Sequence, residues 1–239
     1  YNSERHRTQL NLQYREGSYP RPIRRDFVDF TDGGAISSVE KELVENEQSN
    51  WEVGGDYEFN FGSGSRLSLL LLANNEIRDF VRERFEADPA ADPLSKELFI
   101  DSMLERGEFI AQGNYNFPLT SNQSMRVGLE RADTQVDSSL LLGSASGTEP
   151  PSEDYGGLPP VPSSSNLGTR VQEVRYEGFL FHNWTLSEHS SLESSVVHEI
   201  SEISQSGVVN KVRDFKYWRP SLDYRYNITE AFQIRAILQ

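Results

Sequence analysis

The stretch from Trp51 to Leu72 constrains the fold of this chain most strongly, because it alternates on both sides of a small turn. Before the turn, even positions are mostly polar, and odd positions carry Trp51, Val53, Gly55, Tyr57, Phe59 and Phe61. A period of two gives a β-strand one apolar and one polar face. Residues 62–65, Gly-Ser-Gly-Ser, predict a turn, and a second alternating run begins at Arg66. We therefore predict a β-hairpin.

Composition limits what surrounds this hairpin. Only 36% of the 239 residues are hydrophobic, and the longest apolar run, residues 69–73, is too short for a transmembrane helix. A membrane barrel stays possible because each of its strands needs an apolar residue only at every second position. The formal net charge of -14 argues against a nucleic-acid partner, and the absence of cysteine excludes disulfides and thiol chemistry within these residues.

The same alternation predicts nine strands along the chain. Predicted strands lie near residues 7–15, 38–61, 66–76, 108–117, 125–131, 173–186, 192–200, 218–226 and 232–238. Polar connections are expected at residues 16–37, 87–97, 143–168 and 207–211, the third of them a mobile loop, and short turns at 62–65, 120–123, 187–190 and 228–230. The alternation weakens near Ala132, which predicts a β-bulge. It is also broken by Leu70, Leu72, Phe179 and Phe181.

Three regularities favour an antiparallel, up-and-down transmembrane β-barrel. Short and long connections alternate, and aromatic residues gather beside the short turns. Aromatic pairs eight residues apart occur at Trp51 and Phe59, Tyr176 and Trp184, and Trp218 and Tyr226. At about 3.3 Å per residue this spacing is about 26 Å, close to the height of the apolar band between the aromatic girdles of such barrels. The alternatives are a soluble or secreted, adhesin-like β-sandwich with a buried apolar face, and a passive porin.

Four segments resemble the barrel portion of TonB-dependent outer-membrane receptors. They are WEVGGDYEFNFGSGSRLSLLLL, ERGEFIAQGNYNFPLTSNQSMRVGLE, VRYEGFLFHNWTLSEHSSLESSVVHEISEISQSG and WRPSLDYRYNITEAFQIRA. The resemblance implies a barrel of about 22 strands in a bacterial, Gram-negative outer membrane. It also implies a plug inside the barrel and active uptake of a scarce nutrient, of siderophore, cobalamin, glycan or peptide type. The implied partners are outer-membrane lipid and lipopolysaccharide, the receptor's own plug domain, the TonB system and an unknown nutrient ligand.

Nine strands cannot close a barrel of that size. The resemblance therefore implies that residues 1–239 are an internal fragment, a partial outer-membrane β-barrel domain whose plug and remaining strands lie outside this sequence.

The sequence offers no constellation for catalysis. Its histidines, His6, His182, His189 and His198, lack metal-ligand spacing. We therefore expect no enzymatic activity, no catalytic residue, no cofactor and no metal site, and the residues that bind substrate are unknown.

The polar strand positions carry charges of both signs. They are Glu52, Asp56, Glu58, Arg66, Glu108, Arg126, Glu130, Glu173, Arg175, Glu177, Arg219, Asp223, Arg225 and Arg235. We expect them to pair across strands on a hydrated wall. The sharper hypothesis is that some of them contact a plug or a substrate. The acidic loop 149–157 is a further candidate for ligand contact, against the simpler interpretation that it is solvated.

Overall fold

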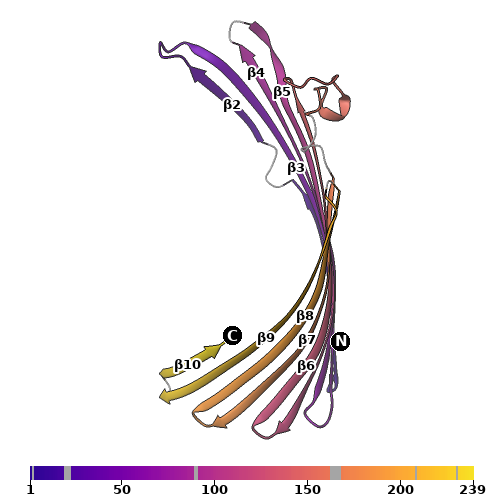
Figure 1. The fold of residues 1–239 in the computed structure, drawn as a ribbon, viewed down its shortest axis with the longest axis vertical. Coiled ribbons are helices and arrows are strands. Elements are labelled where there is room, and N and C mark those ends of the chain that lie inside the picture. Colours follow the sequence, from indigo (N-terminus) through magenta and orange to yellow (C-terminus); the bar gives the residue numbers. More distant parts are fainter. Residues whose placement is uncertain (2, 19–22, 89–90, 162–167, 208, 230) are drawn as a thin grey trace.

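The computed structural model describes residues 1, 3–18, 23–88, 91–161, 168–207, 209–229 and 231–239. These residues form one curved antiparallel sheet (Figure 1). Its strands are β1 (His6–Gly17), β2 (Ile23–Phe30), β3 (Ile36–Asn60), β4 (Arg66–Asp88), β5 (Ala91–Thr120), β6 (Gln123–Ser144), β7 (Thr169–Ser187), β8 (Ser190–Gly207), β9 (Lys211–Thr229) and β10 (Phe232–Leu238). From β3 onward each strand pairs with the next along the chain, so the predicted up-and-down topology is confirmed.

The predicted short turns at residues 62–65, 120–123 and 187–190 are confirmed at one end of the sheet, the lower end in Figure 1. The fourth predicted turn, 228–230, includes residue 230, which lies outside the described residues. Between β3 and β4, the amide of Phe61 donates a 2.8 Å hydrogen bond to the carbonyl of Ser65. Gly64 has a φ of 81°, a conformation that glycine adopts without steric cost. The small residues of this turn therefore fix the hairpin from which the prediction began.

The structure corrects the predicted connection at residues 16–37. Ile23–Phe30 forms β2, which pairs with β3 in the same antiparallel sense as β1 and beyond it along β3. The true turn comes later, where the amide of Thr31 donates a 2.7 Å hydrogen bond to the carbonyl of Ala35. Because β1 and β2 follow one another along a single neighbour, the ten observed strands correspond to the nine predicted ones plus this added segment.

The predicted connection at residues 87–97 is also largely strand, because β4 runs to Asp88 and β5 begins at Ala91. The predicted strand 38–61 is confirmed as β3, which includes the charged residues before Trp51. A ladder of backbone hydrogen bonds needs no apolar face, so polar segments can extend it. At the end of the sheet away from the short turns, the strands continue well beyond the part that alternates between apolar and polar residues. In β3 this extension is residues 36–50, which is about 50 Å long.

The long segment after β6 folds back onto the sheet. It contains a short 3-10 helix, η1 (Glu153–Tyr155). The ammonium of Lys96 donates a 2.9 Å hydrogen bond to the carbonyl of Gly156, and Leu158 is buried. We predicted a mobile loop for residues 143–168, whereas residues 143–161 pack against the sheet through these contacts. Residues 162–167 lie outside the described residues. The acidic loop 149–157 is thereby placed beside β5.

The β-bulge predicted near Ala132 is wrong. The register of β6 with both neighbours is continuous there, since Ala132 lies opposite Ile110 on β5 and Arg175 on β7. The alternation weakens for another reason. Arg131 and Asp133 occupy positions on the face that is apolar in neighbouring strands, where they form an ion pair with a 2.8 Å contact.

The sheet has no interior of its own. Among the described apolar residues, only Val44, Ala132 and Leu158 are buried. From β3 to β9 the register places the apolar rows on one side, which we call the apolar face, and the charged rows on the other, which we call the charged face. No described helix is long and apolar enough to span a membrane.

Candidate functional site

The charged face is the candidate site, and its central feature is a row of three glutamates. Glu130, Glu177 and Glu199 lie directly opposite one another on β6, β7 and β8. Like charges in this position repel one another. Their side chains are only 12–18% exposed, so water alone does not screen them.

Two arginines neutralise part of this negative charge. Arg175 contacts Glu130 at 3.0 Å and Glu177 at 3.5 Å. Arg219 contacts Glu177 at 2.9 Å and Glu199 at 2.8 Å. Each guanidinium therefore bridges two carboxylates on neighbouring strands, and the five side chains form one chain of alternating charge with a formal sum of one negative charge. We call these five residues the glutamate row.

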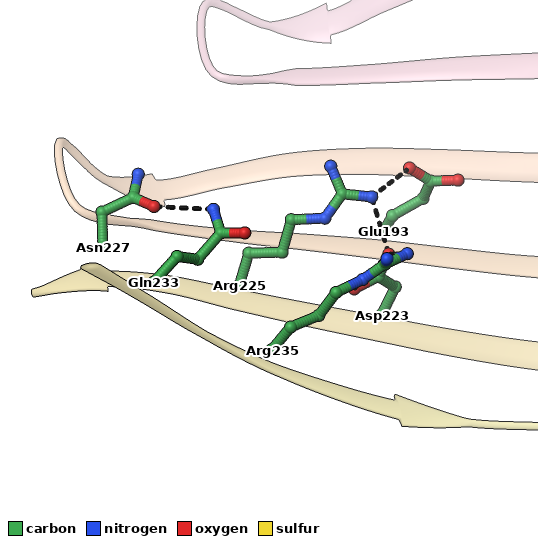
Figure 2. A network of polar contacts seen from close by, with 6 residues as sticks. All are labelled: Glu193, Asp223, Arg225, Asn227, Gln233 and Arg235. Carbon is green, nitrogen blue, oxygen red and sulfur yellow. Dashed lines mark hydrogen bonds and ion pairs between the residues drawn. The ribbon is translucent and has the colours of Figure 1, made fainter. Parts of the chain in front are cut away.

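A second cluster lies near the last short turn. Arg225 and Arg235 are directly opposite on β9 and β10, and Asp223 lies between them with contacts of 2.6 and 2.5 Å (Figure 2). Glu193 approaches Arg225 at 3.9 Å. The side chain of Asp223 is 11% exposed, so its charge depends on the two guanidiniums for compensation. Asn227 and Gln233 close the turn end of the cluster through a 2.7 Å hydrogen bond.

A third cluster of ion pairs connects β2 to its neighbour β3 and to β4. Glu42 on β3 contacts Arg25 on β2 at 2.9 Å and Arg82 on β4. The side chain of Glu42 is only 3% exposed, and the two arginines supply the positive charge that such burial requires. Sequence patterning missed this cluster, because β2 was not predicted and the pairing depends on it.

The predicted charged positions all share the charged face, but the structure groups only some of them. It brings together Glu130, Arg175, Glu177 and Arg219, then Asp223, Arg225 and Arg235, and it places Glu58 at 3.9 Å from Arg66. Glu52, Asp56, Glu108 and Glu173 lie on the same face outside these clusters. Glu193 and Glu199 belong to the clusters but were absent from the predicted set. Both lie at polar positions of the alternating pattern in β8, so the sequence pattern could have predicted that they share the charged face.

The apolar residues that interrupt the polar alternation pack on the charged face. The rings of Phe179 and Phe181 meet edge to face with 5.7 Å between centroids. The guanidinium of Arg126 lies 4.3 Å above the centroid of Phe181, within the range of a cation–π contact. A Cβ atom on Gly128 would lie 2.4 Å from the ring of Phe179, so the missing side chain makes room for that ring.

Three of the four histidines contact aromatic or amide groups. His6 lies 2.9 Å from the hydroxyl of Tyr57, and His182 lies 3.1 Å from the amide oxygen of Gln123. The ring centroids of His198 and Trp218 are 4.2 Å apart, with the ring planes tilted by 32°. In the part of the chain that the structure describes, no three His, Asp or Glu side chains are grouped as metal ligands.

The charged face thus presents paired charges of both signs, and the opposite face presents exposed apolar side chains. Leu71 is 56% exposed, and Leu129 and Trp218 are 72% and 68% exposed. The arrangement suits a sheet that separates a polar environment from an apolar one.

Comparison with known proteins gives a similarity in structure but none in sequence. No protein-family model and no curated protein matches the sequence. Among solved structures, the chain is similar to the crystal structure of the ferric citrate transporter FecA in the unliganded form, with 11% sequence identity and a TM-score of 0.45. The match covers 96% of this chain and 43% of that chain, so this chain spans less than half of that protein's length.

Proposed function

We propose that this chain is part of the barrel of a TonB-dependent receptor that takes up a scarce nutrient across a bacterial outer membrane. The observation that carries the proposal is the apolar face. A soluble sandwich covers such a face with a second sheet, whereas the described residues form a single sheet with this face exposed. Lipid is the solvent that stabilises an apolar face of this extent.

Rings at the turn end of the apolar face support the proposal. The ring of Phe59 lies 4.9 Å from His6 and 4.7 Å from Phe61, and Phe61 continues the row to Tyr115 at 5.9 Å. Tyr115 then stacks on Phe117 at 5.4 Å. A row of rings across several strands at one level is the pattern of an interfacial aromatic girdle. In this proposal the short turns face the periplasm and the long strand extensions face outward.

The charged face fits the inner wall of the same barrel. Lumen-facing residues of transmembrane barrels are polar, and the half-exposed guanidinium of Arg219 in the glutamate row can contact the water there. In a receptor of the proposed kind this wall surrounds a plug, which is a natural partner for charges that are only partly neutralised. The substrate is a siderophore, cobalamin, a glycan or a peptide.

Uptake by cells tests the proposal. Cells that produce the complete protein are given radiolabelled ferric chelates, cobalamin, oligosaccharides and peptides, with and without a protonophore and in the presence and absence of TonB. We expect accumulation of one class that stops when either TonB or the proton gradient is removed. Accumulation that is indifferent to both would identify a passive porin and contradict the proposal.

A further inference from the structure

A hollow lies on the charged face between the glutamate row and the last short turn. Its volume is about 700 Å³, within the usual range for small-molecule sites. Phe181, Ser195 and Ser221 line it and are directly opposite one another on β7, β8 and β9. The rows on either side carry longer side chains, Val197 and Arg219 toward the glutamate row and Glu193 and Asp223 toward the turn. The short side chains of the two serines therefore leave room between these rows.

Part of the hollow is apolar. Phe181, Val197 and Ile237 line it, although they lie on an otherwise polar face, and Ile237 is 51% exposed. The ring of Phe181 is held in place by the edge-to-face contact with Phe179 and by the guanidinium of Arg126. Apolar surface that is already fixed in position is stabilised when an apolar group displaces water from it. An occupant of the hollow should therefore have an apolar part.

The part of the hollow nearest the turn is rich in guanidinium groups (Figure 2). Arg235 donates to both oxygens of Asp223, from Nε at 2.9 Å and from Nη2 at 2.5 Å. Arg225 donates to the same carboxylate at 2.6 Å, whereas Glu193 is 3.9 Å away and 47% exposed. Two guanidiniums thus share one carboxylate at close range. A guanidinium has five N–H donors, and in the described contacts Arg225 donates to Asp223 from Nη2 alone, so donors remain for a second carboxylate.

The charges in the hollow favour an occupant with a single negative charge. A planar carboxylate matches the fork of donors that an arginine presents. A phosphate with two negative charges would be repelled more strongly by Glu193 and Asp223, which also line the hollow. A neutral molecule would gain nothing from the two guanidiniums beyond ordinary hydrogen bonds.

We propose that this hollow binds a small aromatic carboxylate. The aromatic ring packs against Phe181, Val197 and Ile237, and the carboxylate accepts hydrogen bonds from Arg225 and Arg235. The lining belongs to this sheet alone, but its position on the path of a transported solute rests on the proposed function. Asp223 is six residues from Thr229 at the turn, about 20 Å along the strand, or about 15 Å in height at the usual barrel tilt of about 40°. The apolar band is about 25 Å tall, so the site lies on the wall of the lumen within the membrane.

Binding is tested with the complete protein in nanodiscs, by equilibrium dialysis against three radiolabelled probes. 1-Naphthylacetate has both the ring and the charge, 1-naphthylacetamide has the ring without the charge, and acetate has the charge without the ring. Empty nanodiscs give the partition into lipid, which is subtracted. We expect saturable binding of 1-naphthylacetate that is at least about tenfold tighter than that of either other probe.

Two variants separate the roles of charge and shape. Arg235→Gln should weaken binding of 1-naphthylacetate about tenfold and leave the amide unchanged, because it removes one guanidinium. Ser195→Leu should weaken the acid and the amide alike by about tenfold or more, because the leucine occupies the hollow. Arg66→Gln is the control for charge, since Arg66 is 48% exposed on the same face and Arg235 is 50% exposed. Ser68→Leu, opposite Glu58 on β3, is the control for shape. Neither control should change binding.

Three outcomes would overturn the inference. The wild type could show no saturable binding of 1-naphthylacetate, which is also the result if a segment of the polypeptide fills the hollow. The acid could bind no more tightly than the amide, or the controls could weaken binding as much as the variants in the hollow. If Arg235→Gln does not fold, the comparison of acid and amide in the wild type and in Ser195→Leu decides the question. TonB-dependent uptake measured in parallel keeps the proposals distinct: uptake without this binding contradicts only the hollow, and binding without TonB-dependent uptake of any solute contradicts only the proposed function.

Discussion

Leu71→Arg tests which face of the sheet meets lipid. Leu71 lies on the apolar face, between Gly55 and Ala111 on the neighbouring strands and near the middle of the proposed band. An arginine on the lipid face at the bilayer midplane costs about 2–4 kcal/mol. At about 1.4 kcal/mol for each factor of ten, the folding equilibrium constant should fall by about one and a half to three decades. Guanidinium unfolding of the complete protein in lipid vesicles, followed by tryptophan fluorescence, measures the change in the free energy of unfolding.

The adjacent residue is the control. Leu70 lies on the charged face, directly opposite Asp56 on β3. An arginine there gains an opposite charge across the strand pair, a contact that contributes about 0.2–1 kcal/mol, and it remains in water. Leu70→Arg should therefore change the free energy of unfolding by less than about 1 kcal/mol. Equal effects of the two substitutions would refute the assignment of the apolar face to lipid.

Two further predictions concern the charged clusters and their acid dependence. Arg219→Met should lower the free energy of unfolding by about 1 kcal/mol, because it leaves Glu177 and Glu199 facing one another; the value is reduced from that of a buried pair since Arg219 is 55% exposed. Adding Glu199→Gln should recover part of the lost free energy of unfolding. A double mutant no more stable than Arg219→Met would contradict the proposed repulsion between Glu177 and Glu199. The hydrogen bond from Arg170 lowers the pKa of Asp137, which lies above the proposed band, below its ordinary value of 3.8. The resulting stabilisation is complete above that value and is lost as the pH falls through the lowered pKa; in an NMR titration Arg170→Gln should raise the pKa of Asp137, and an unchanged pKa would exclude the contact.

Alternation along single strands predicted the faces of the sheet but not the ends of its strands. Apolar residues at every second position report which side meets an apolar environment, and this signal was read correctly from Trp51 to Phe61. It disappears where both faces are polar, so β4 was predicted to end near residue 76 and the start of β5 was taken for a connection. β2 was missed for the same reason and because Pro20 and Pro22, which cannot donate ladder hydrogen bonds, precede it.

The charged face was predictable as a set of positions, but its clusters were not. Whether Glu130, Glu177 and Glu199 share a row depends on the register of three strands, and a shift of two residues in either pairing would separate them without changing any face. The alternation within each strand can be seen in a single sequence, but the register between neighbouring strands cannot.

The most direct test of the account locates the two ends of the sheet relative to the membrane. The chain has no cysteine, so Thr148→Cys in the long segment and Ser63→Cys in the β3–β4 turn give single labelling sites within these residues, both exposed, in the complete protein freed of any other cysteine. Intact cells are treated with a membrane-impermeant maleimide. We expect labelling of Thr148→Cys in intact cells and of Ser63→Cys only after the cells are broken. Equal labelling at the two sites in intact cells would place both ends in one compartment and contradict the transmembrane barrel.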